Sequence, residues 1–326
     1  QGLHRAGISV VLDVVYNHVY EGETFCFNQI VPEYFSRTHN GHYSNGSGCG
    51  NDTASERSMV HKYIVDSVKY WADEYHIDGF RFDLVGLLDV DTINELVDSV
   101  RARHPNVIFY GEGWSMATEL TKPDVAMATQ RNAWQTPNFA YFSDTLRDVL
   151  RGYVFDDRAY GYVAGAQGQE ELVKACFMGH PDWCPCPTQT INYASCHDNM
   201  ALFDRLTMSA PDASFADRVR MNNLAAAIYM LSQGVPFLQA GEELLRSKPL
   251  PGGGFEHNSY CSPDSINSIK WNDLSKPEYA ANAEYYRGLI AFRKAHPTLR
   301  LTTDEAVREQ VHALEGLPEN VVGFHL

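Results

Sequence analysis

The sequence repeats one pattern that constrains the fold: short apolar segments end in polar or charged residues and alternate with segments of helical periodicity. Residues 8–15 are almost continuously apolar and lead into Tyr16-Asn17-His18. Such a run is typical of a strand with both faces buried. Strands that alternate with helices form a parallel sheet, and polar residues at their carboxyl ends are typical of the catalytic face of a (β/α)8 TIM barrel. Further strands are predicted at residues 79–83, 107–112, 189–196 and 235–240, with a less clear one between residues 134 and 142.

The number of strands sets the domain boundaries. Six strands are two fewer than a (β/α)8 barrel needs, so we expect residues 1–298 to form a barrel that lacks its first two βα units. Residues 299–326 contain short β-like pieces such as Val321-Val322-Gly323-Phe324, and are predicted to begin a C-terminal β-sandwich domain. Helices are predicted at residues 55–75, 91–103, 144–150, 169–178, 215–231 and 278–295, the second of them capped by Asp91 or Thr92.

Charge and cysteine content restrict the partners and the compartment. The formal net charge of -15 argues against a nucleic acid or an anionic membrane surface as partner. No apolar run approaches the roughly 20 residues that span a bilayer. Seven cysteines, an odd number, do not resemble a disulfide framework, so a cytoplasmic location is expected over secretion. Cys176, His180, Cys184 and Cys186 have donor types that zinc uses, but their spacing favours a loop with incidental thiols.

The segment Gly79-Phe80-Arg81-Phe82-Asp83 combines a strand with charged residues. Side chains alternate along a strand, so Arg81 and Asp83 are predicted on one face, and Phe80, Phe82 and Leu84 on the other. A carboxylate two residues from an arginine stays ionised near neutral pH because the cation favours its charged form. This suits a nucleophile, while the alternative is a structural ion pair at the end of a strand.

Three acids are predicted to converge at one rim: Asp83, Glu112 and Asp198. Glycoside hydrolysis needs two carboxyl groups across the scissile bond, one to attack or stabilise the anomeric carbon and one to protonate the leaving oxygen. Tyr110 and Trp114 flank Glu112 at i±2, so Glu112 is expected in a less polar setting that keeps it protonated. Asp83, beside Arg81, would be the ionised partner.

Other side chains at this rim can hold a sugar. His18 and His197 can hydrogen-bond hydroxyl groups, and Trp114 can stack on a sugar face. Trp71 is different, because it belongs to the apolar stripe of the helix at residues 55–75 and is expected in the core.

Four segments resemble, in order, the four motifs of the α-amylase family of glycoside hydrolases (glycoside hydrolase family 13). The Tyr-Gly-Glu-Gly-Trp form is most similar to the type I pullulanases of that family. The resemblance extends through Gly241-Glu242-Glu243 and Asn258-Ser259-Tyr260 and covers nearly the whole chain. The four segments are Asp13-Val14-Val15-Tyr16-Asn17-His18, Gly79-Phe80-Arg81-Phe82-Asp83, Tyr110-Gly111-Glu112-Gly113-Trp114 and Ile191-Asn192-Tyr193-Ala194-Ser195-Cys196-His197-Asp198-Asn199.

The resemblance implies a role for each matching residue and a substrate. It implies that Asp83 is the nucleophile, Glu112 the general acid/base and Asp198 the transition-state stabiliser. It also implies retaining hydrolysis of α-1,6-glucosidic linkages in pullulan, amylopectin and related α-glucans. The residues that match sugar-holding positions are His18, Arg81 and His197, and those that match rim-supporting positions are Asp13 and Asn17.

Cofactor and alternative functions follow from the same resemblance. Asn17 aligns with a calcium ligand in some relatives, but calcium is not supported here and no cofactor is expected. Another enzyme of the family, a glycogen debranching enzyme or a transglycosylase, would share the three acids and differ in the loops after Asn17 and Gly241. A non-catalytic glucan-binding relative is a third reading, against which the intact set of acids argues.

Overall fold

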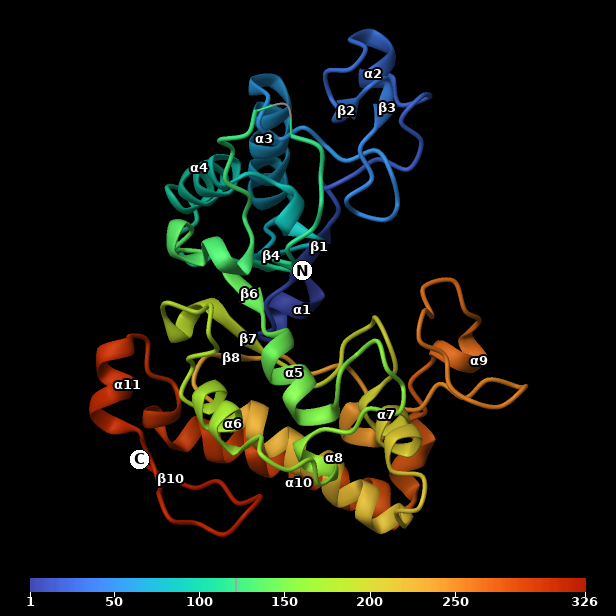
Figure 1. The fold of residues 1–326 in the computed structure, drawn as a ribbon, viewed down its shortest axis with the longest axis vertical. Coiled ribbons are helices and arrows are strands. Elements are labelled where there is room, and N and C mark those ends of the chain that lie inside the picture. Colours follow the sequence, from blue (N-terminus) through green and yellow to red (C-terminus); the bar gives the residue numbers. More distant parts are fainter. Residues whose placement is uncertain (121) are drawn as a thin grey trace. The chain divides into compact units, whose positions relative to one another are not determined.

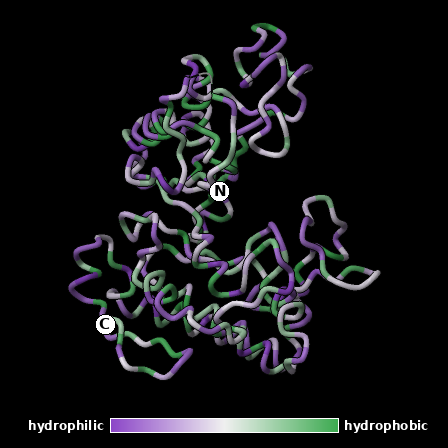
Figure 2. Tube along the Cα trace, viewed as in Figure 1, coloured by the Kyte–Doolittle hydropathy of each residue, from purple (hydrophilic) through white to green (hydrophobic). Residues whose placement is uncertain are grey.

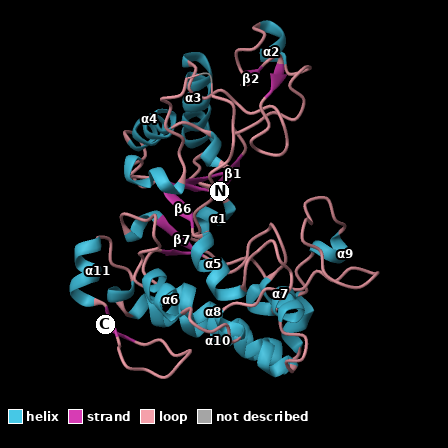
Figure 3. Cartoon of the chain, in the orientation of Figure 1, coloured by secondary structure: helices cyan, strands magenta, loops and turns pink. Residues whose placement is uncertain are grey.

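The computed structural model describes residues 1–120 and 122–326, and the chain forms two compact units (Figure 1). Unit 1 comprises Gln1–Phe142 with Trp183–Pro185. Unit 2 comprises Ser143–Asp182 and Cys186–Leu326. Helices and loops make up most of both units, and the strands are short (Figure 3).

Unit 1 contains four parallel strands, β1, β4, β5 and β6, which neighbour one another in that order. Each new strand is added on the same side of the sheet, as in a barrel, whereas a doubly wound sheet reverses direction. The elements of unit 1, with η for 3-10 helices, are α1 Gly2–Arg5, β1 Val11–Val14, α2 Cys26–Ile30, β2 Thr38–His39, β3 His42–Tyr43, α3 Ser58–Tyr75, β4 Gly79–Phe82, η1 Val85–Leu87, α4 Val90–Arg101, β5 Ile108–Gly111, η2 Gln130–Gln135 and β6 Ala140–Phe142.

The register of the sheet sorts polar from apolar side chains. Asp13 pairs with Arg81, and Arg81 pairs with Tyr110, so these three lie in one row across β1, β4 and β5. Phe80 and Phe82 alternate with Arg81 and are completely buried. They share one core cluster with the apolar faces of α3 and α4. The predicted alternation in β4 is therefore confirmed, with helices over the apolar face.

The helix before β4 forms as its pattern predicts. Val60, Ile64 and Val68 of α3 are buried in the core of unit 1. Trp71 is partly buried and packs against the same cluster, which agrees with the core interpretation. The helix ends at Tyr75, and the left-handed φ of 54° at His76 turns the chain towards β4.

Three local details of unit 1 differ from the predictions. β1 is shorter than residues 8–15, and it is not buried on both faces, because Asp13 is exposed and the strand has β4 as its only neighbour in the described sheet. Leu84 is not part of β4, since its φ of 38° places it in the left-handed region. The cap of α4 is Asp89, which accepts a hydrogen bond from the backbone N–H of Thr92.

The long segment after β1 is held by buried polar groups. Asp52 accepts hydrogen bonds from Ser44 Oγ, the backbone N–H of Gly46 and Thr118 Oγ1, each at 2.7 Å. Arg37 forms a buried ion pair with Glu56 at 2.8 Å. These contacts hold the segment between β1 and α3 in one ordered arrangement.

Unit 2 is mainly helical and contains the parallel pair β7–β8, in which Ile191 pairs with Val235. Its elements are α5 Asp144–Arg151, η3 Tyr162–Ala164, α6 Glu170–Phe177, η4 Pro187–Gln189, β7 Thr190–Asn192, α7 Leu202–Ser209, α8 Phe215–Leu231, β8 Val235–Pro236, η5 Glu242–Leu244, α9 Asp264–Asn267, η6 Trp271–Ser275, α10 Pro277–Ala295, η7 Pro297–Leu299, α11 Asp304–Gln310, β9 His312–Ala313 and β10 Phe324–His325.

The core of unit 2 gathers around α8. Ala225, Ala226 and Tyr229 of α8 are fully buried. They belong to a cluster with Leu206 of α7 and Leu289 of α10. Polar and apolar residues are interspersed along the helices of both units (Figure 2). None of the helices formed by the described residues is long and apolar enough to cross a membrane.

The last residues of the chain pack onto unit 2. Strands β9 and β10 pair antiparallel, and the ring of Phe324 stacks on Phe177 of α6 with centroids 3.8 Å apart. Tyr162 Oη donates a hydrogen bond to the carbonyl oxygen of Asn320 at 2.8 Å. The structure thus shows β structure in this region, while the assignment of residues 299–326 to a separate β-sandwich domain stays a prediction.

Candidate active site

One guanidinium group organises the polar row of unit 1. Arg81 Nη1 lies 2.9 Å from Asp13 Oδ1 and 2.9 Å from Asp83 Oδ1, and Nη2 lies 3.0 Å from Glu112 Oε2. The Arg81 side chain is only 7% exposed. Burial alone would lower the pKa of Arg81, but the charges of Glu112, Asp13 and Asp83 outweigh it and raise the pKa. The arginine is therefore a permanent cation between three acids.

Asp83 is fixed from a second side by the residue pair that follows β1. Asn17 Nδ2 donates to the carbonyl oxygen of Asp83 at 2.8 Å and to its Oδ2 at 2.9 Å. His18 Nδ1 lies 2.6 Å from Asn17 Oδ1. Asp83 retains a side-chain exposure of 23%, so its carboxylate is oriented by Arg81 and Asn17 yet still reached from solvent.

Glu112 lies close to the same cation. Its Oε2 also accepts a hydrogen bond at 3.1 Å from the backbone N–H of Leu84, which the left-handed turn after β4 directs towards it. The side chain is 10% exposed. The expectation of a less polar setting for Glu112 is thus wrong, because an arginine two strand positions from Asp83 reaches both acids.

Close backbone packing holds the loops that carry these acids. A Cβ atom on Gly86 would lie 2.0 Å from the carbonyl oxygen of Trp114. The backbone N–H of Gly86 donates to the carbonyl oxygen of Glu112 at 3.1 Å. The loop after Asp83 and the loop after Glu112 are thereby fixed to one another through a glycine.

The aromatic neighbours of Glu112 occupy different environments. Tyr110 is largely buried, and burial raises the pKa of its hydroxyl. Its ring lies 5.6 Å from that of Phe142. Trp114 is partly exposed next to Glu112, a position compatible with contact to a ligand.

The other two predicted site residues belong to unit 2. His197 and Asp198 follow β7 and are both exposed, with side-chain fractions of 57% and 50%. His197 Nε2 lies 3.4 Å from Asp198 Oδ2. Asn199 has a φ of 62°, so the chain turns sharply after the acid. The structure places Asp83, Glu112, Arg81, His18 and Trp114 in unit 1. The catalytic roles of Asp83, Glu112 and Asp198 and the sugar contacts of the other four predicted site residues stay predictions.

Buried groups that the sequence analysis did not identify support the loop with Asp198. Glu242 is fully buried and accepts hydrogen bonds from Ser195 Oγ at 2.6 Å, Tyr229 Oη at 2.7 Å and Tyr286 Oη at 2.9 Å. Burial raises the pKa of Glu242, although the three hydroxyl donors act in the opposite direction. Two sequence signals marked Glu242: its place shortly after a predicted strand, and the segment Gly241-Glu242-Glu243 that is part of the family resemblance.

Two arginines on α5 support the same loop. Arg147 Nη1 lies 3.0 Å from Tyr193 Oη, and Arg151 Nη1 donates to the carbonyl oxygen of Met200 at 2.9 Å. Burial lowers the pKa of Arg151 to about 10. The two residues are four apart on one helix, a spacing that places them on one face. From that spacing, the sequence could have predicted that both arginines contact the same part of the structure.

The candidate metal ligands do not fit a metal. The two ends of the Asn17 side-chain amide already contact Asp83 and His18, so a calcium ion would have to displace these partners. His180 Nε2 lies 2.8 Å from Asp304 Oδ1. Within residues 1–120 and 122–326, no group of three or more His, Cys, Asp or Glu side chains is arranged to hold a metal ion.

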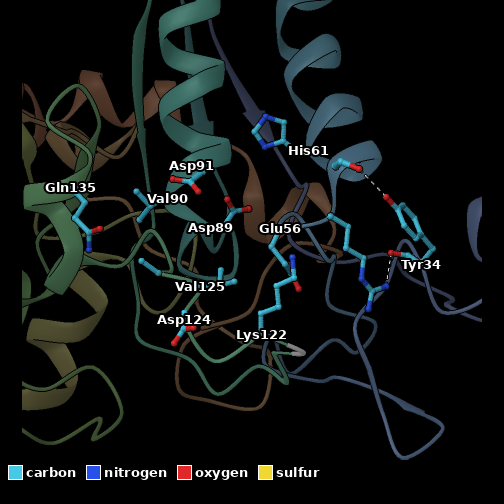
Figure 4. A pocket seen from close by; sticks show the side chains of 13 residues that line it. Tyr34, Glu56, His61, Asp89, Val90, Asp91, Lys122, Asp124, Val125 and Gln135 are labelled. Carbon is cyan, nitrogen blue, oxygen red and sulfur yellow. Dashed lines mark hydrogen bonds between the residues drawn. The ribbon is translucent and has the colours of Figure 1, made fainter.

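A pocket of about 840 Å³ in unit 1 is lined by none of the residues that surround Arg81. It is lined by the starts of α3 and α4, with His61 and Asp91, and by Tyr34, Lys122 and Gln135 (Figure 4). None of the predicted site residues lines it. The candidate active site is therefore the cluster of Arg81 with Asp13, Asp83 and Glu112, and not this cavity.

Comparison with known proteins agrees with the fold. The catalytic domain of the alpha-amylase family matches residues 49–284. The chain is 39% identical over 331 residues to the pullulanase of Bacillus subtilis strain 168, covering 99% of this chain and 45% of that protein. It is 28% identical to a glycogen debranching enzyme of Pectobacterium carotovorum, covering 93% of this chain and 49% of that one.

A solved structure gives the same picture. The pullulanase of Paenibacillus barengoltzii superposes with a TM-score of 0.92 at 40% identity, covering 99% of this chain and 50% of that one. The chain thus spans about half the length of the relatives it matches. The match of the family's catalytic domain to residues 49–284 and the 39% identity to the Bacillus pullulanase show that this chain belongs to the α-amylase family of glycoside hydrolases.

Proposed function

We propose that this chain is the catalytic part of an α-glucan debranching enzyme that hydrolyses α-1,6-glucosidic linkages, as in pullulan and amylopectin. The observation that carries the proposal is the contact of Asp83 and Glu112 with one guanidinium group. A retaining glycosidase uses two carboxyl groups about 5–5.5 Å apart, and the shared guanidinium group keeps Asp83 and Glu112 near one another.

In the proposed mechanism the two acids divide the work. Asp83, fixed by Arg81 and Asn17, attacks the anomeric carbon while Glu112 protonates the departing glycosidic oxygen. Water then attacks the glycosyl–enzyme intermediate, Glu112 accepts its proton, and the sugar leaves with retained configuration. Asp198 stabilises the positive charge that develops on the sugar ring. No cofactor is required.

The relatives support the choice of substrate. The Paenibacillus pullulanase was solved with maltohexaose and alpha-cyclodextrin, and a pullulanase of Anoxybacillus with maltotetraose. These three ligands and the proposed substrate are all neutral α-glucans, which a chain with a formal net charge of -15 does not repel. His18, His197 and Trp114 are the proposed contacts to the sugar.

A second candidate within the family is debranching of glycogen side chains. The similarity to the glycogen debranching enzyme of Pectobacterium carotovorum supports this reading. Glycogen debranching would use the same acids and the same chemistry. It would differ only in the branched polymer that the loops after Asn17 and Gly241 accept.

The test is release of reducing sugar from pullulan by the wild type and by Asp83→Asn. The wild type is expected to form maltotriose, and the variant to lose at least about a thousandfold in kcat, because the amide cannot act as nucleophile. Asp91→Asn, an exposed acid at the start of α4, is the matched control and is expected to keep full activity.

The product pattern distinguishes the candidates. Maltotriose from pullulan supports α-1,6 cleavage. Activity on glycogen without activity on pullulan would support the second candidate. A wild type that binds pullulan and releases no sugar from any α-glucan would contradict both.

A further inference from the structure

A pocket of about 430 Å³ in unit 2 lies apart from every predicted site residue. Ligand sites in proteins commonly enclose about 300–1,000 Å³. One wall is the face of α5 that carries Asp144, Thr145 and Asp148. The opposite side is formed by the loop of residues 152–161, with Tyr153 and Tyr160, and by Gln169 before α6. The pocket is therefore lined by aromatic rings and short polar side chains together.

The loop of residues 152–161 has its two ends in contact. Gly152 has a φ of 92°, and a Cβ on it would lie 2.2 Å from the carbonyl oxygen of Ala159. A Cβ on Gly161 would lie 2.5 Å from the backbone nitrogen of Gly152. Only glycine tolerates this conformation and this approach without strain. Tyr153 and Tyr160, which adjoin these two glycines, both line the pocket.

A buried arginine holds the inside of this loop. Arg205 is 2% exposed, and its Nη2 donates to the carbonyl oxygens of Tyr153 and Ala159, each at 2.8 Å, and to that of Asp156. Three carbonyl groups on one buried cation fix the backbone of a surface loop. A loop fixed in this way loses little conformational entropy when a ligand binds to it.

The loop directs aromatic rings into solvent. Tyr153 and Tyr160 are each 57% exposed, and Phe155 is 80% exposed. The rings of Tyr153 and Phe155 are in edge contact, with centroids 5.5 Å apart. Aromatic rings on a rigid, exposed support offer flat apolar faces against which the C–H groups of a sugar ring can pack.

The polar side chains of the pocket select for a neutral ligand rich in hydroxyl groups. Asp144 and Asp148 are partly exposed carboxylates that accept hydrogen bonds and repel anions. Asp148 is oriented by Arg147, whose Nε and Nη2 lie 2.6 and 3.2 Å from its two oxygens. Thr145 and Gln169 add groups that both donate and accept.

We infer that this pocket is a second binding site for α-glucan, which holds a segment of the polymer outside the catalytic cluster. The ligand class rests on the proposed function, and the pocket itself rests on the contacts above. Arg147 also contacts Tyr193, at the start of the loop with Asp198. The pocket is therefore built on the same helix that supports one of the predicted catalytic loops.

Calorimetric titration with maltohexaose tests the site directly. The protein carries Asp83→Asn throughout, so that hydrolysis does not interfere. Tyr153→Ala/Tyr160→Ala is expected to lose one binding event that the parent shows, with affinity at the pocket reduced about tenfold or more. Tyr153→Phe/Tyr160→Phe keeps the rings and is expected to keep most of the affinity. Tyr285→Ala, an exposed tyrosine on α10, is the matched control.

Kinetics with active Asp83 give a second readout. Tyr153→Ala/Tyr160→Ala is expected to raise KM for amylopectin about tenfold with kcat unchanged, because only ground-state binding is lost. KM for a short branched oligosaccharide, which fills the catalytic cluster alone, is expected to stay the same. Equal losses on both substrates would overturn the inference, since the tyrosines would then act on catalysis.

A second variant keeps the test decisive if the alanine variant unfolds. Ala166→Trp adds a large ring at the pocket wall and is expected to block maltohexaose from it. A titration that neither variant changes would overturn the second site, even with hydrolysis intact. A wild type inactive on every α-glucan would instead contradict the proposed function, and the titration would still decide whether the pocket binds maltohexaose.

Discussion

Arg81 permits three carboxylates to lie within hydrogen-bond distance of one group. Asp13, Asp83 and Glu112 would repel one another if they were ionised without a cation between them. The arginine is itself buried, so its charge is weakly screened by solvent. It fixes the orientation of the proposed nucleophile and of the proposed acid together, and this double contact is what a lysine could not reproduce.

Arg81→Ala is expected to change the pH dependence of catalysis as well as its rate. An adjacent cation favours the ionised form of a carboxyl group, so its removal should move the acidic limb of the pH–activity profile to higher pH. We expect kcat to fall by about a hundredfold or more. The pH–rate profile on pullulan measures both effects. Arg103→Ala, an exposed arginine, is the control, and a profile in Arg81→Ala that only loses height would contradict the argument.

Asp204 is a buried acid away from the catalytic cluster. It is completely buried on α7, accepts a hydrogen bond from Ser247 Oγ, and accepts one from the backbone N–H of Lys248 at 2.7 Å. Burial raises the pKa of Asp204 to about 6, against the effect of these donors and of the Lys248 ammonium. The acid holds the start of the segment between η5 and α9.

The stability of the protein should therefore depend on Asp204 between pH 4 and pH 7. The folded pKa lies above the unfolded value, so the folded state retains a proton that the unfolded state has released. The stabilisation is present at low pH and is lost as the pH rises through about 6. Relative to Asp204→Asn, the wild type should lose about 2 kcal/mol of unfolding free energy across this range.

Chemical denaturation at each pH measures this difference. Asp217→Asn is the control, because hydrogen bonds from Ser214 and Arg220 lower the pKa of Asp217 and give a slope of opposite sign. Parallel stability curves for the wild type and Asp204→Asn would contradict the raised pKa.

The residues of the site were predictable from sequence where a strand fixed their direction. Arg81 and Asp83 alternate with two phenylalanines, and period two decides the face on which each lies. The hydrogen bond from the backbone N–H of Leu84 to Glu112 was not predictable from sequence. It depends on a left-handed backbone conformation at Leu84, which few non-glycine residues adopt. The support from Glu242 joins residues 47 positions apart, beyond the reach of any local pattern.

Among the elements, helices were predicted better than strands. Helix α8 begins at Phe215 and ends at Leu231, as its pattern predicts. Helix α7, at Leu202–Ser209, was not predicted, because it starts soon after the motif that ends at Asn199. Strand β7 covers only Thr190–Asn192 of the predicted residues 189–196, since the chain leaves the sheet to form the loop with Asp198. An apolar run therefore predicts that a strand is present, whereas the residue at which the strand ends depends on how the following loop packs.

Two glycines test how closely the elements around the site are packed. Gly86→Ala would place a Cβ 2.0 Å from the carbonyl oxygen of Trp114, so we expect a loss of about 1–3 kcal/mol in unfolding free energy and a lower kcat. Gly288→Ala in α10 meets no atom within 4 Å and should stabilise the helix by about 0.5–1 kcal/mol. Urea denaturation and pullulan kinetics compare the two. If Gly86→Ala has the same unfolding free energy as the wild type, the loops after Asp83 and Glu112 can move apart without loss of stability.

At the scale of the whole molecule, the sequence predicted the order of the sheet but not the division into two units. Each unit encloses its own apolar cluster, and the chain passes from unit 1 to unit 2 between Phe142 and Ser143. That point lies between a strand and the helix that directly follows it, with no Gly- or Pro-rich linker to mark it. Periodicity identifies elements one at a time, whereas a unit is defined by contacts between distant ones.

The edge of β1 allows a last prediction, about the association of this 326-residue chain. In the described sheet β1 has β4 as its only neighbour, and the exposed apolar residues Ile8 and Val15 flank it. An unpaired strand edge of this kind can pair with another chain. We expect the weight-average mass in light scattering to rise with concentration, and Ile8→Lys/Val15→Lys to reduce that rise, because charges beside an edge oppose pairing.

Leu224→Lys/Ile290→Lys adds the same charge at exposed positions of unit 2 and should leave the association unchanged. If both double variants reduce the association equally, the reduction comes from the change in net charge, and the prediction that the chain associates through the β1 edge is wrong.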